Sequence, residues 1–538
     1  MQRWRSTASW VAVVALTAGA GIAWNVSGAG AASPAAPPCN TRYAEDLFGT
    51  GSLVPVGVPS ASVSGKSAAG AVDLHTASGA AAGRFSEASF AGLPAPGAND
   101  RFGGSVSFAL REVGSCPAIV VGAPGADGGR GTVTVAYGSS NGLDTAHAVR
   151  LVGPSAGSGF GVAVAGDGPD IWVGAPYVSV DGVPGAGAVY HYKIQSDNSI
   201  KLFETLTENT AAVPGSAAPD DHFGRVLSAA GTTLAVGVPL RDVNGHANAG
   251  AVTLLTRSGG MYGSPNTPLR AVTFTQDSAG VPGVTETNDY FGSAISFASR
   301  PAIPVGEGPD SYLLAVGVPD EDIGSVKDAG TIDVFEIDAV TLRPNLVFGA
   351  MQGGSGGLPG ANEAGDHFGA SVAVGSYLGN DLGAGDVASD DVAVGVPGED
   401  LGSVKDAGDV LIVRIYNDYQ HTPRLTYVAP ALRQGGGGDG DVGGAAQAGD
   451  QFGAGVGAFN VSDSGGPSGI TSRPVVSIPG DDFGATDAGA VVLVGKHAGV
   501  GTPNYADVTL RDSAGPATGE RYGVTGTTSS APGYQYCC

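Results

Sequence analysis

Residues 365–415 read GDHFGASVAVGSYLGNDLGAGDVASDDVAVGVPGEDLGSVKDAGDVLIVRI, and the unit before them, residues 288–337, follows the same plan. Both contain Asp-x-Phe-Gly, an apolar run, Gly-Val-Pro, an acidic loop, Ala-Gly and a second apolar run. Most of the chain consists of copies of this unit. A repeat of this length indicates an array of small structural units, each packed on its neighbours.

The unit recurs along nearly the whole chain. Gly-[Ala/Val]-Pro begins at Gly57, Gly122, Gly174, Gly237, Gly317 and Gly395, with a degenerate copy at Ser477. Phe-Gly precedes the later copies at Phe102, Phe160, Phe223, Phe291, Phe368 and Phe452. Five of these phenylalanines follow an aspartate by two residues: Asp100, Asp221, Asp289, Asp366 and Asp450. Before Phe160 that place is taken by Ser158.

The two ends of the chain complete each other. Phe48 stands nine residues before Gly57, whereas the gap is 14 to 27 residues in the other units. Nine residues are too few for a strand, a turn and a second strand. Residues 520–523 (ERYG) look like an eighth Phe-Gly element with no unit after it. We therefore expect the C-terminal strand to complete the first unit, so that no sheet edge is left at the seam.

Each repeat offers four short strands: one after Phe-Gly, one leading into Gly-Val-Pro, one after Ala-Gly, and an outer one. Residues 269–275, 344–348 and 424–428 are examples of the outer strand. Successive Gly-x-Pro elements lie 52 to 82 residues apart, which suits a four-stranded blade with loops of variable length. The predicted fold is therefore all-β, a seven-bladed β-propeller of four-stranded blades.

The repeated residues have a structural explanation. Glycine permits close approach of two backbones or a positive φ, and proline ends a strand because it cannot donate to the ladder. The phenylalanine supplies a large apolar wedge between neighbouring sheets. We expect the aspartate two residues before it to accept backbone N–H bonds in the turn. The repeated motif is therefore predicted to be scaffold.

Composition and the N-terminus indicate an exported protein. The net charge of −24 argues against non-specific binding to nucleic acid or to anionic membranes. Residues 1–31 have the charged start, apolar stretch and small-residue cleavage site of a signal peptide. Residues 32–42 form a short leader, and residues 43–538 the propeller. We expect a secreted monomer with no membrane span after cleavage.

The chain has four cysteines: Cys39, Cys116, Cys537 and Cys538. In an oxidising compartment four cysteines allow three pairings. Cys39 and the C-terminal pair should lie near the ring closure, where a disulfide would staple the seam. The alternative is a frayed tail with unpaired or adjacent-paired cysteines.

The repeats resemble the FG-GAP repeats of integrin alpha-subunit propellers, and more closely those of secreted bacterial FG-GAP proteins. The resemblance rests on the quoted GDxFG…VAVGVPGEDxGSxxDAG pattern and covers nearly the whole mature chain. It implies a seven-bladed propeller with an extracellular binding or adhesion role. It does not identify a ligand, because function depends on the site and not on the fold.

Members of this family often carry calcium loops of the form Asp-x-Asp-x-Asp-Gly-x-x-Asp, which this chain lacks. The nearest candidate ligands in such a loop are Asp381, Asp386, Asp390 and Asp391. A second acidic set follows Gly-Val-Pro and includes Asp320, Asp322, Glu399 and Asp400. Several oxygens in a short loop can hold calcium. The alternative is a solvated turn in which aspartate bonds nearby backbone N–H groups.

No catalytic motif stands out. Residues 153–157 and 353–357 match Gly-x-Ser-x-Gly formally, without the strand and helix that this motif requires. We therefore predict a non-enzymatic module that binds an extracellular protein or glycan through its loops. The alternatives are a secreted hydrolase with an acidic site in the central channel, and a structural component of the envelope or matrix.

Overall fold

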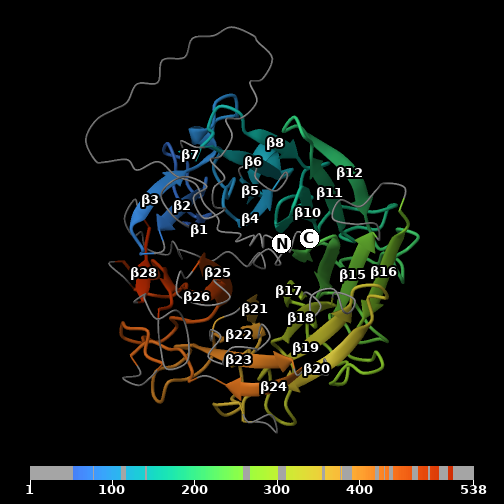
Figure 1. Cartoon of the computed structure of the whole chain (residues 1–538), viewed down its shortest axis with the longest axis vertical. Coiled ribbons are helices and arrows are strands. Elements are labelled where there is room, and N and C mark those ends of the chain that lie inside the picture. The colour runs from blue at the N-terminus through green and yellow to red at the C-terminus, as the bar shows by residue number, and fades with distance from the viewer. Residues whose placement is uncertain are drawn as a thin grey trace, which may run out of the picture.

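The computed structural model describes residues 53–512, except 77, 111–116, 140–141, 258–266, 301–310, 354–357, 376, 378–389, 418–422, 429, 436–439, 463–469, 483–484 and 496–506. These residues form seven antiparallel sheets in sequence order around a ring (Figure 1). Five sheets have four strands, the first has three and the second has five. The predicted all-β, seven-bladed propeller is confirmed.

Each sheet is one blade. Blades 1 to 3 contain β1 (Leu53–Val58), β2 (Ala71–Thr76) and β3 (Ala81–Phe85); β4 (Ser105–Leu110), β5 (Pro117–Ala123), β6 (Thr132–Ser139), β7 (Gly142–Leu143) and β8 (Val149–Val152); and β9 (Val164–Asp167), β10 (Asp170–Ala175), β11 (Ala188–Ile194) and β12 (Ile200–Leu206). Blades 4 and 5 contain β13 (Val226–Ala230), β14 (Thr233–Val238), β15 (Ala251–Arg257) and β16 (Leu269–Phe274); and β17 (Ala294–Arg300), β18 (Ser311–Val318), β19 (Thr331–Asp338) and β20 (Pro344–Ala350). Blades 6 and 7 contain β21 (Ser371–Gly375), β22 (Asp390–Val396), β23 (Asp409–Asn417) and β24 (Pro423–Val428); and β25 (Gly455–Ser462), β26 (Ile470–Ile478), β27 (Ala490–Leu493) and β28 (Val508–Leu510). The helical pieces are short: α1 (Ala126–Gly129) and a 3-10 turn at Glu87–Ser89.

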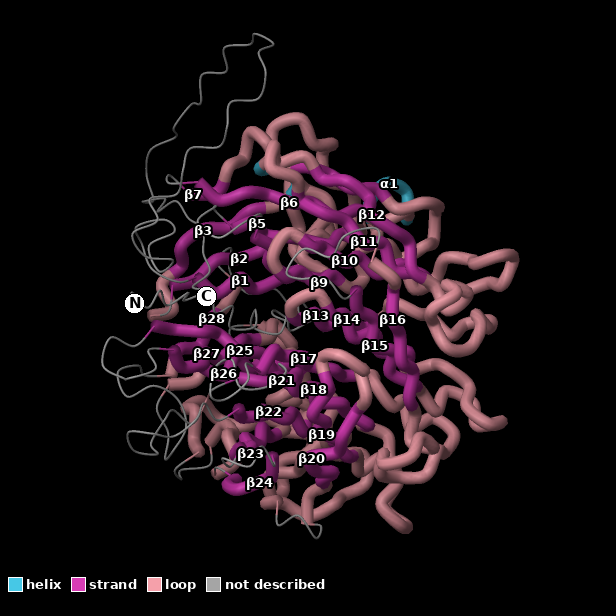
Figure 2. The backbone as a smooth tube through the Cα atoms, turned by 45° about the vertical axis from the view of Figure 1, so that its right-hand side comes forward, coloured by secondary structure: helices cyan, strands magenta, loops and turns pink. Residues whose placement is uncertain are grey.

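The strand order places all the repeated motifs on one side of the ring. In blade 4, β14 pairs antiparallel with β13 and with β15. Proline follows the Gly-Val-Pro strand directly in all seven blades, as expected for a residue with no N–H for the ladder. The Phe-Gly turns, the loops after proline and the Ala-Gly elements thus share one face, which we call the motif face. The turns between the first and second strands lie on the opposite face, which we call the hairpin face. Figure 2 shows loops that project beyond the strand ends.

The Phe-Gly element joins each blade to the one before it. Its phenylalanine is fully buried, at 0% exposure, in all six copies: Phe102, Phe160, Phe223, Phe291, Phe368 and Phe452. At five junctions its backbone N–H donates at 2.9 Å to the alanine carbonyl of the preceding blade's Ala-Gly element: Phe102 to Ala69, Phe223 to Ala186, Phe291 to Ala249, Phe368 to Ala329 and Phe452 to Ala407. We call this pairing the blade latch. The prediction that Phe-Gly is an inter-blade wedge is confirmed.

Glycine is needed where Gly-Val-Pro meets the next blade. A Cβ atom at Gly395 would lie 1.9 Å from the carbonyl oxygen of Gly453, and one at Gly174 would lie 2.0 Å from that of Gly224. Both neighbours belong to the Phe-Gly elements of the following blades. Because backbone meets backbone here, no side chain can move aside to make room.

The ring closes within the described residues, because blade 1 packs on blade 7 (Figure 1). Val54, Val56 and Val58 of β1 share a buried cluster with residues of β27 and β28. On β3, Nη2 of Arg84 donates to Oδ2 of Asp512 at 3.1 Å. Blade 1 has no strand inside β1 among the described residues. The predicted occupant of that place, the strand after residues 520–523, lies outside them and stays a prediction.

Several other predictions also concern residues outside the described part of the chain. These are the signal peptide at residues 1–31, the leader at residues 32–42, and all four cysteines, Cys39, Cys116, Cys537 and Cys538. Among the residues that are described, there is no helix of the length and apolar character that crossing a membrane requires.

Candidate functional site

The aspartates of the motif face hold its turns. Each accepts a hydrogen bond from the backbone N–H three residues before it: at 3.0 Å for Asp221, 2.6 Å for Asp289, 2.6 Å for Asp366 and 2.7 Å for Asp450, and in the same way for Asp100. The expected turn-forming role is confirmed. Burial raises the pKa of Asp366 to about 7, although the N–H of Glu363 lowers it. These carboxyl groups therefore have a structural role in the turns.

One residue in each turn varies while its backbone stays the same. This is the residue between Asp and Phe, and its φ angle is positive in every case: 58° for Arg101, 58° for His222, 55° for Tyr290, 53° for His367 and 56° for Gln451. Their side chains are exposed or partly exposed. We call these five the display residues. They differ in charge, size and hydrogen-bonding capacity on a common backbone.

The display residues occupy a conformation that other side chains avoid. Residues with a Cβ adopt positive φ rarely; glycine does so most easily, and asparagine, aspartate and histidine do so more often than other side chains such as arginine, tyrosine and glutamine. The neighbouring positive-φ place two residues earlier follows that rule: it holds Asn99, Asp220, Asn288, Gly365 and Gly449. The display place holds arginine, tyrosine, glutamine and two histidines instead. Backbone strain that persists in this way is a pointer to function.

Blade 3 departs from the pattern. Its turn reads Ser158-Gly159-Phe160, so the display place is a glycine, with φ +66°. A Cβ atom there would lie 2.6 Å from Cδ2 of Tyr177, whose ring covers the glycine. Tyr177 comes from the post-proline loop of the same blade and is 42% exposed. An aromatic side chain therefore occupies this sector of the motif face as well.

The acidic loops of the motif face bond mainly to themselves. Asp322 pairs with Lys327 and accepts the backbone N–H of Asp328 at 3.1 Å. Asp400 pairs with Lys405 and accepts the backbone N–H of Asp406 at 3.0 Å. These are the contacts of a turn in which aspartate bonds nearby backbone N–H groups, the alternative to a calcium-binding loop.

The other two candidate ligands in these loops have partners elsewhere on the motif face. Oδ1 of Asp320 lies 2.8 Å from Nδ1 of His367. Nε2 of Gln352 donates to Oε2 of Glu399 at 2.7 Å. In the part of the chain that the structure describes, no three His, Cys, Asp or Glu side chains gather as a metal ion would require.

The first set of candidate ligands lies elsewhere. Asp390 and Asp391 begin β22 at the hairpin face, away from the post-proline loops. Asp391 is fully buried, and its Oδ1 accepts from Nε of Arg414 at 3.0 Å. Asp381 and Asp386 lie outside the described residues. Asp390 and Asp391 therefore lie on the face opposite to the second set of acidic residues.

A second contact between blades recurs beside the motif face, and the sequence did not reveal it. A glutamine after the outer strand of one blade donates to an acidic side chain in the next blade's post-proline loop: Gln276 to Glu321 at 2.6 Å, Gln352 to Glu399 at 2.7 Å and Gln434 to Asp481 at 3.3 Å. Burial raises the pKa of Glu321 to about 7. At the junction of blades 3 and 4, Glu208 and Arg241 form an ion pair at the equivalent place. The recurring Gln was the available signal.

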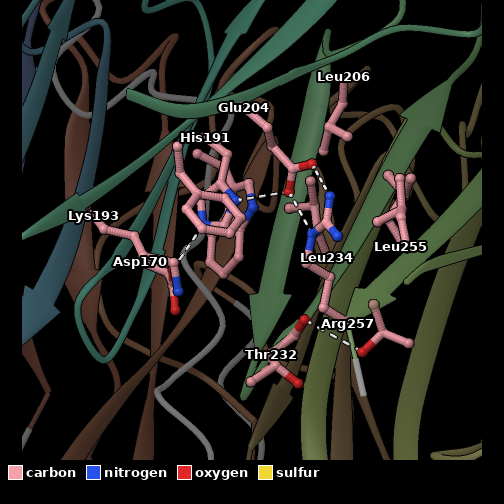
Figure 3. A pocket seen from close by; sticks show the side chains of 13 residues that line it. Asp170, His191, Lys193, Glu204, Leu206, Thr232, Leu234, Leu255 and Arg257 are labelled. Atoms are coloured by element: carbon pink, nitrogen blue, oxygen red, sulfur yellow. Dashed lines mark hydrogen bonds and ion pairs between the residues drawn. The ribbon is translucent and has the colours of Figure 1, made fainter. Parts of the chain in front are cut away.

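The hairpin face carries a charged cleft between blades 3 and 4 (Figure 3). His191 lies between two carboxylates: Nε2 is 2.6 Å from Oδ1 of Asp170, and Nδ1 is 3.2 Å from Oε1 of Glu204. Burial lowers the pKa of His191, but these two carboxylates raise it more, so the net shift is upward. Glu204 also forms an ion pair with Arg257 of blade 4. The cluster thus bridges two blades by charge.

Aromatic rings complete the cleft. His191 stacks on Trp172 at 4.9 Å between centroids, and the ammonium of Lys193 lies 4.8 Å from the centroid of Phe203. Lys193 also pairs with Asp170 at 2.8 Å. The space left for water is ≈ 20 Å³, about the room that one or two water molecules need. The charges of this cleft are therefore paired with one another.

No family model and no curated protein matches the chain. Among solved structures, the chain is similar to the periplasmic gluconolactonase PpgL of Pseudomonas aeruginosa, at 13% identity and a TM-score of 0.39 over 86% of this chain and 97% of that one. It is also similar to Sqt1 from Chaetomium thermophilum, at 13% identity and a TM-score of 0.37 over 87% of this chain and 82% of that one. Likenesses at this level carry no inference about activity.

Proposed function

We propose that this chain is a secreted, non-enzymatic binding module of the FG-GAP type, and that its motif face recognises an extracellular protein or glycan. The display residues carry the proposal. Glycine would fit their backbone without strain, yet five large polar side chains occupy it on one face. Tyrosine, arginine and histidine also suit recognition, because they combine contact area with directional hydrogen bonds.

The repeat resemblance supports the same conclusion. In FG-GAP propellers the blades are scaffold and the loops recognise partners. The turns here follow that division, since the backbone contacts recur from blade to blade while one outward side chain changes. Export, for which the N-terminal residues 1–31 provide the signal, would place the face among extracellular proteins and glycans.

The test is capture of the purified protein on a panel of cell-wall material, extracellular proteins and glycans, with calcium and with a chelator. The decisive variant replaces Arg101, His222, Tyr290, His367 and Gln451 together by glycine, which removes the side chains and relieves the backbone. The matched control replaces Leu202 and Val340, both 53% exposed and outside the motif face, by serine. We expect saturable capture that weakens by about tenfold or more in the glycine variant, since central contacts dominate binding energy.

The control variant should bind like the wild type. Capture that the glycine variant retains in full would contradict the proposal, as would turnover of a panel glycan without saturable binding. Loss of capture on chelation would indicate a cation near the face, whereas indifference to the chelator would remove calcium from the function.

A further inference from the structure

Blade 3 differs from the other repeats in the place where the proposed recognition face is richest in aromatic and cationic groups. It is the blade whose Phe-Gly turn has serine in place of the aspartate and glycine at the display place. In a repeat protein, residues shared by all units are explained by the fold, and a departure confined to one unit calls for another explanation. The departure here creates the seat of Tyr177.

Three side chains from two blades meet at this point, and we call them the Tyr177 cluster: Tyr177, His222 and Arg225. The ring of His222 meets the ring of Tyr177 edge to face, with centroids 4.9 Å apart and planes at 89°. Nη1 of Arg225 donates to the phenol oxygen of Tyr177 at 3.2 Å. Tyr177 is thus held by a ring contact and at its hydroxyl, and the residue remains 42% exposed.

The cluster has unused hydrogen-bonding capacity. Arginine carries five N–H donors in a planar fork, and Arg225 is exposed, with the Tyr177 hydroxyl as its partner in the described part of the chain. Nδ1 of His222 is buried without a hydrogen-bond partner among the described residues. The acidic neighbour Asp220 contacts the imidazole, with its Oδ1 3.9 Å from Nε2 of His222. The guanidinium is therefore free to take an anionic group.

Burial lowers the pKa of His222, and the charge of Arg225 lowers it further, against the opposing effect of Asp220 and Asp221. The imidazole is thus neutral near pH 7 and offers one N–H donor. Arg225 then supplies the positive charge of the cluster.

We propose that the Tyr177 cluster is a subsite for an acidic sugar, in which a pyranose ring packs on the exposed side of Tyr177 and its carboxylate pairs with Arg225. This inference rests on the proposed binding function and names the ligand class of its face. The C–H bonds of a pyranose suit the electron-rich face of an aromatic ring, and a carboxylate matches the guanidinium fork.

The geometry favours a sugar over an acidic peptide. The guanidinium lies at the hydroxyl tip of Tyr177, so its donors are just beyond the edge of the aromatic ring. A pyranose stacked on that ring carries its carboxylate one bond beyond its own edge, at the same place. A peptide carboxylate on a flexible side chain would lose rotamer freedom to reach both groups at once.

The test measures binding of a galacturonate hexamer and of sialyllactose, each beside a neutral counterpart: the methyl-esterified hexamer, and lactose. A poly-glutamate peptide is the third probe. The variants are Arg225→Gln and Tyr177→Leu, with Arg343→Gln, an exposed arginine in the β19–β20 hairpin outside the motif face, as the matched control. We expect at least one acidic sugar to bind, with Kd rising about tenfold or more on removal of its charge and in Arg225→Gln.

Tyr177→Leu should weaken the neutral and acidic sugars alike, because it removes the stacking surface and leaves the guanidinium. Arg343→Gln should leave both unchanged. Equal binding by wild type and Arg225→Gln, or Arg225-dependent capture of poly-glutamate without capture of either sugar, would overturn the inference. If the display residues are needed for capture of some other panel ligand while no acidic sugar binds, the subsite is wrong and the binding function stands.

Discussion

The two faces of this propeller follow different rules. On the motif face the same contacts recur from blade to blade: the latch, the aspartate that holds the turn, and the glutamine that reaches an acidic loop of the next blade. On the hairpin face the polar contacts differ from place to place, such as the His191 cluster that joins blades 3 and 4 or the Asp391–Arg414 pair within blade 6. A repeated face builds the ring, and it leaves one side chain per turn free to vary.

The sharpest difference should appear in the glycines. Gly395→Ala would place a methyl group 1.9 Å from a backbone oxygen of the next blade, whereas Gly168, in the β9–β10 hairpin at φ +53°, has no atom within 4 Å of an added Cβ. We expect Gly395→Ala to cost more than the about 1–3 kcal/mol of ordinary overpacking, and Gly168→Ala to cost about 1 kcal/mol. Denaturant unfolding of the two variants measures this. Equal losses of stability would mean that the close approach of Gly395 to the backbone of Gly453 does not hold the two blades together.

Next in size is the charge bridge of the hairpin face. Glu204→Gln removes the charge that Arg257 and His191 share, so it should destabilise by about 2 kcal/mol, as for other hydrogen bonds to charged groups. Because this bridge joins only blades 3 and 4, hydrogen exchange should quicken in β11, β12 and β15 and stay unchanged in blades 6 and 7. Faster exchange around the whole ring would contradict the local character of this face.

Titration offers a smaller effect on the motif face. Burial raises the pKa of Asp366 to about 7 and that of Asp289 to about 6 in the folded protein. A carboxyl group whose pKa is higher in the folded than in the unfolded protein contributes its full stabilisation below the unfolded pKa, which is near 4. That stabilisation is lost as the pH rises through the folded pKa. The melting temperature should therefore fall between about pH 5 and pH 7.5.

Asp366→Asn keeps an acceptor for the N–H of Glu363 and removes the titration. It should reduce the loss of folding free energy across this pH range by an amount on the order of 1 kcal/mol. One unit of pKa shift corresponds to about 1.4 kcal/mol, and contact of the carboxyl group with solvent reduces that contribution. Asp322→Asn is the control. Lys327 and the N–H of Asp328 hold the pKa of Asp322 below its usual range, so its contribution is lost only at lower pH. An unchanged slope in Asp366→Asn would count against a buried, protonated turn aspartate.

The smallest effect concerns the display residues. Tyr290→Gly should leave stability unchanged or raise it by up to about 1 kcal/mol, because glycine adopts the φ of +55° without strain. The reference is Phe291→Gly, one residue later, which removes a fully buried ring and should unfold the blade. Calorimetry of both variants decides the matter. A clear destabilisation in Tyr290→Gly would show that the display side chains are structural.

The fold could be predicted because its determinants are local and repeated. Phe-Gly, Gly-Val-Pro and Ala-Gly each require particular residues wherever the backbone comes close, so seven copies reveal the ring. The His191 cluster could not be predicted, because its members come from β10, β11, β12 and β15, and their meeting depends on strand register. Tyr177 escaped notice for the same reason: its seat is made by Gly159, which reads in the sequence as one more turn glycine.

The blade latch has a direction at each of its five junctions, since the N–H comes from the later blade and the carbonyl from the earlier one. A chain cut at one of these junctions would therefore leave one fragment ending in an acceptor and another beginning with a donor. The two pieces are complementary to each other at the cut. The propeller is thus suited to reassembly from two separately expressed pieces, with their order fixed by the polarity of a single hydrogen bond.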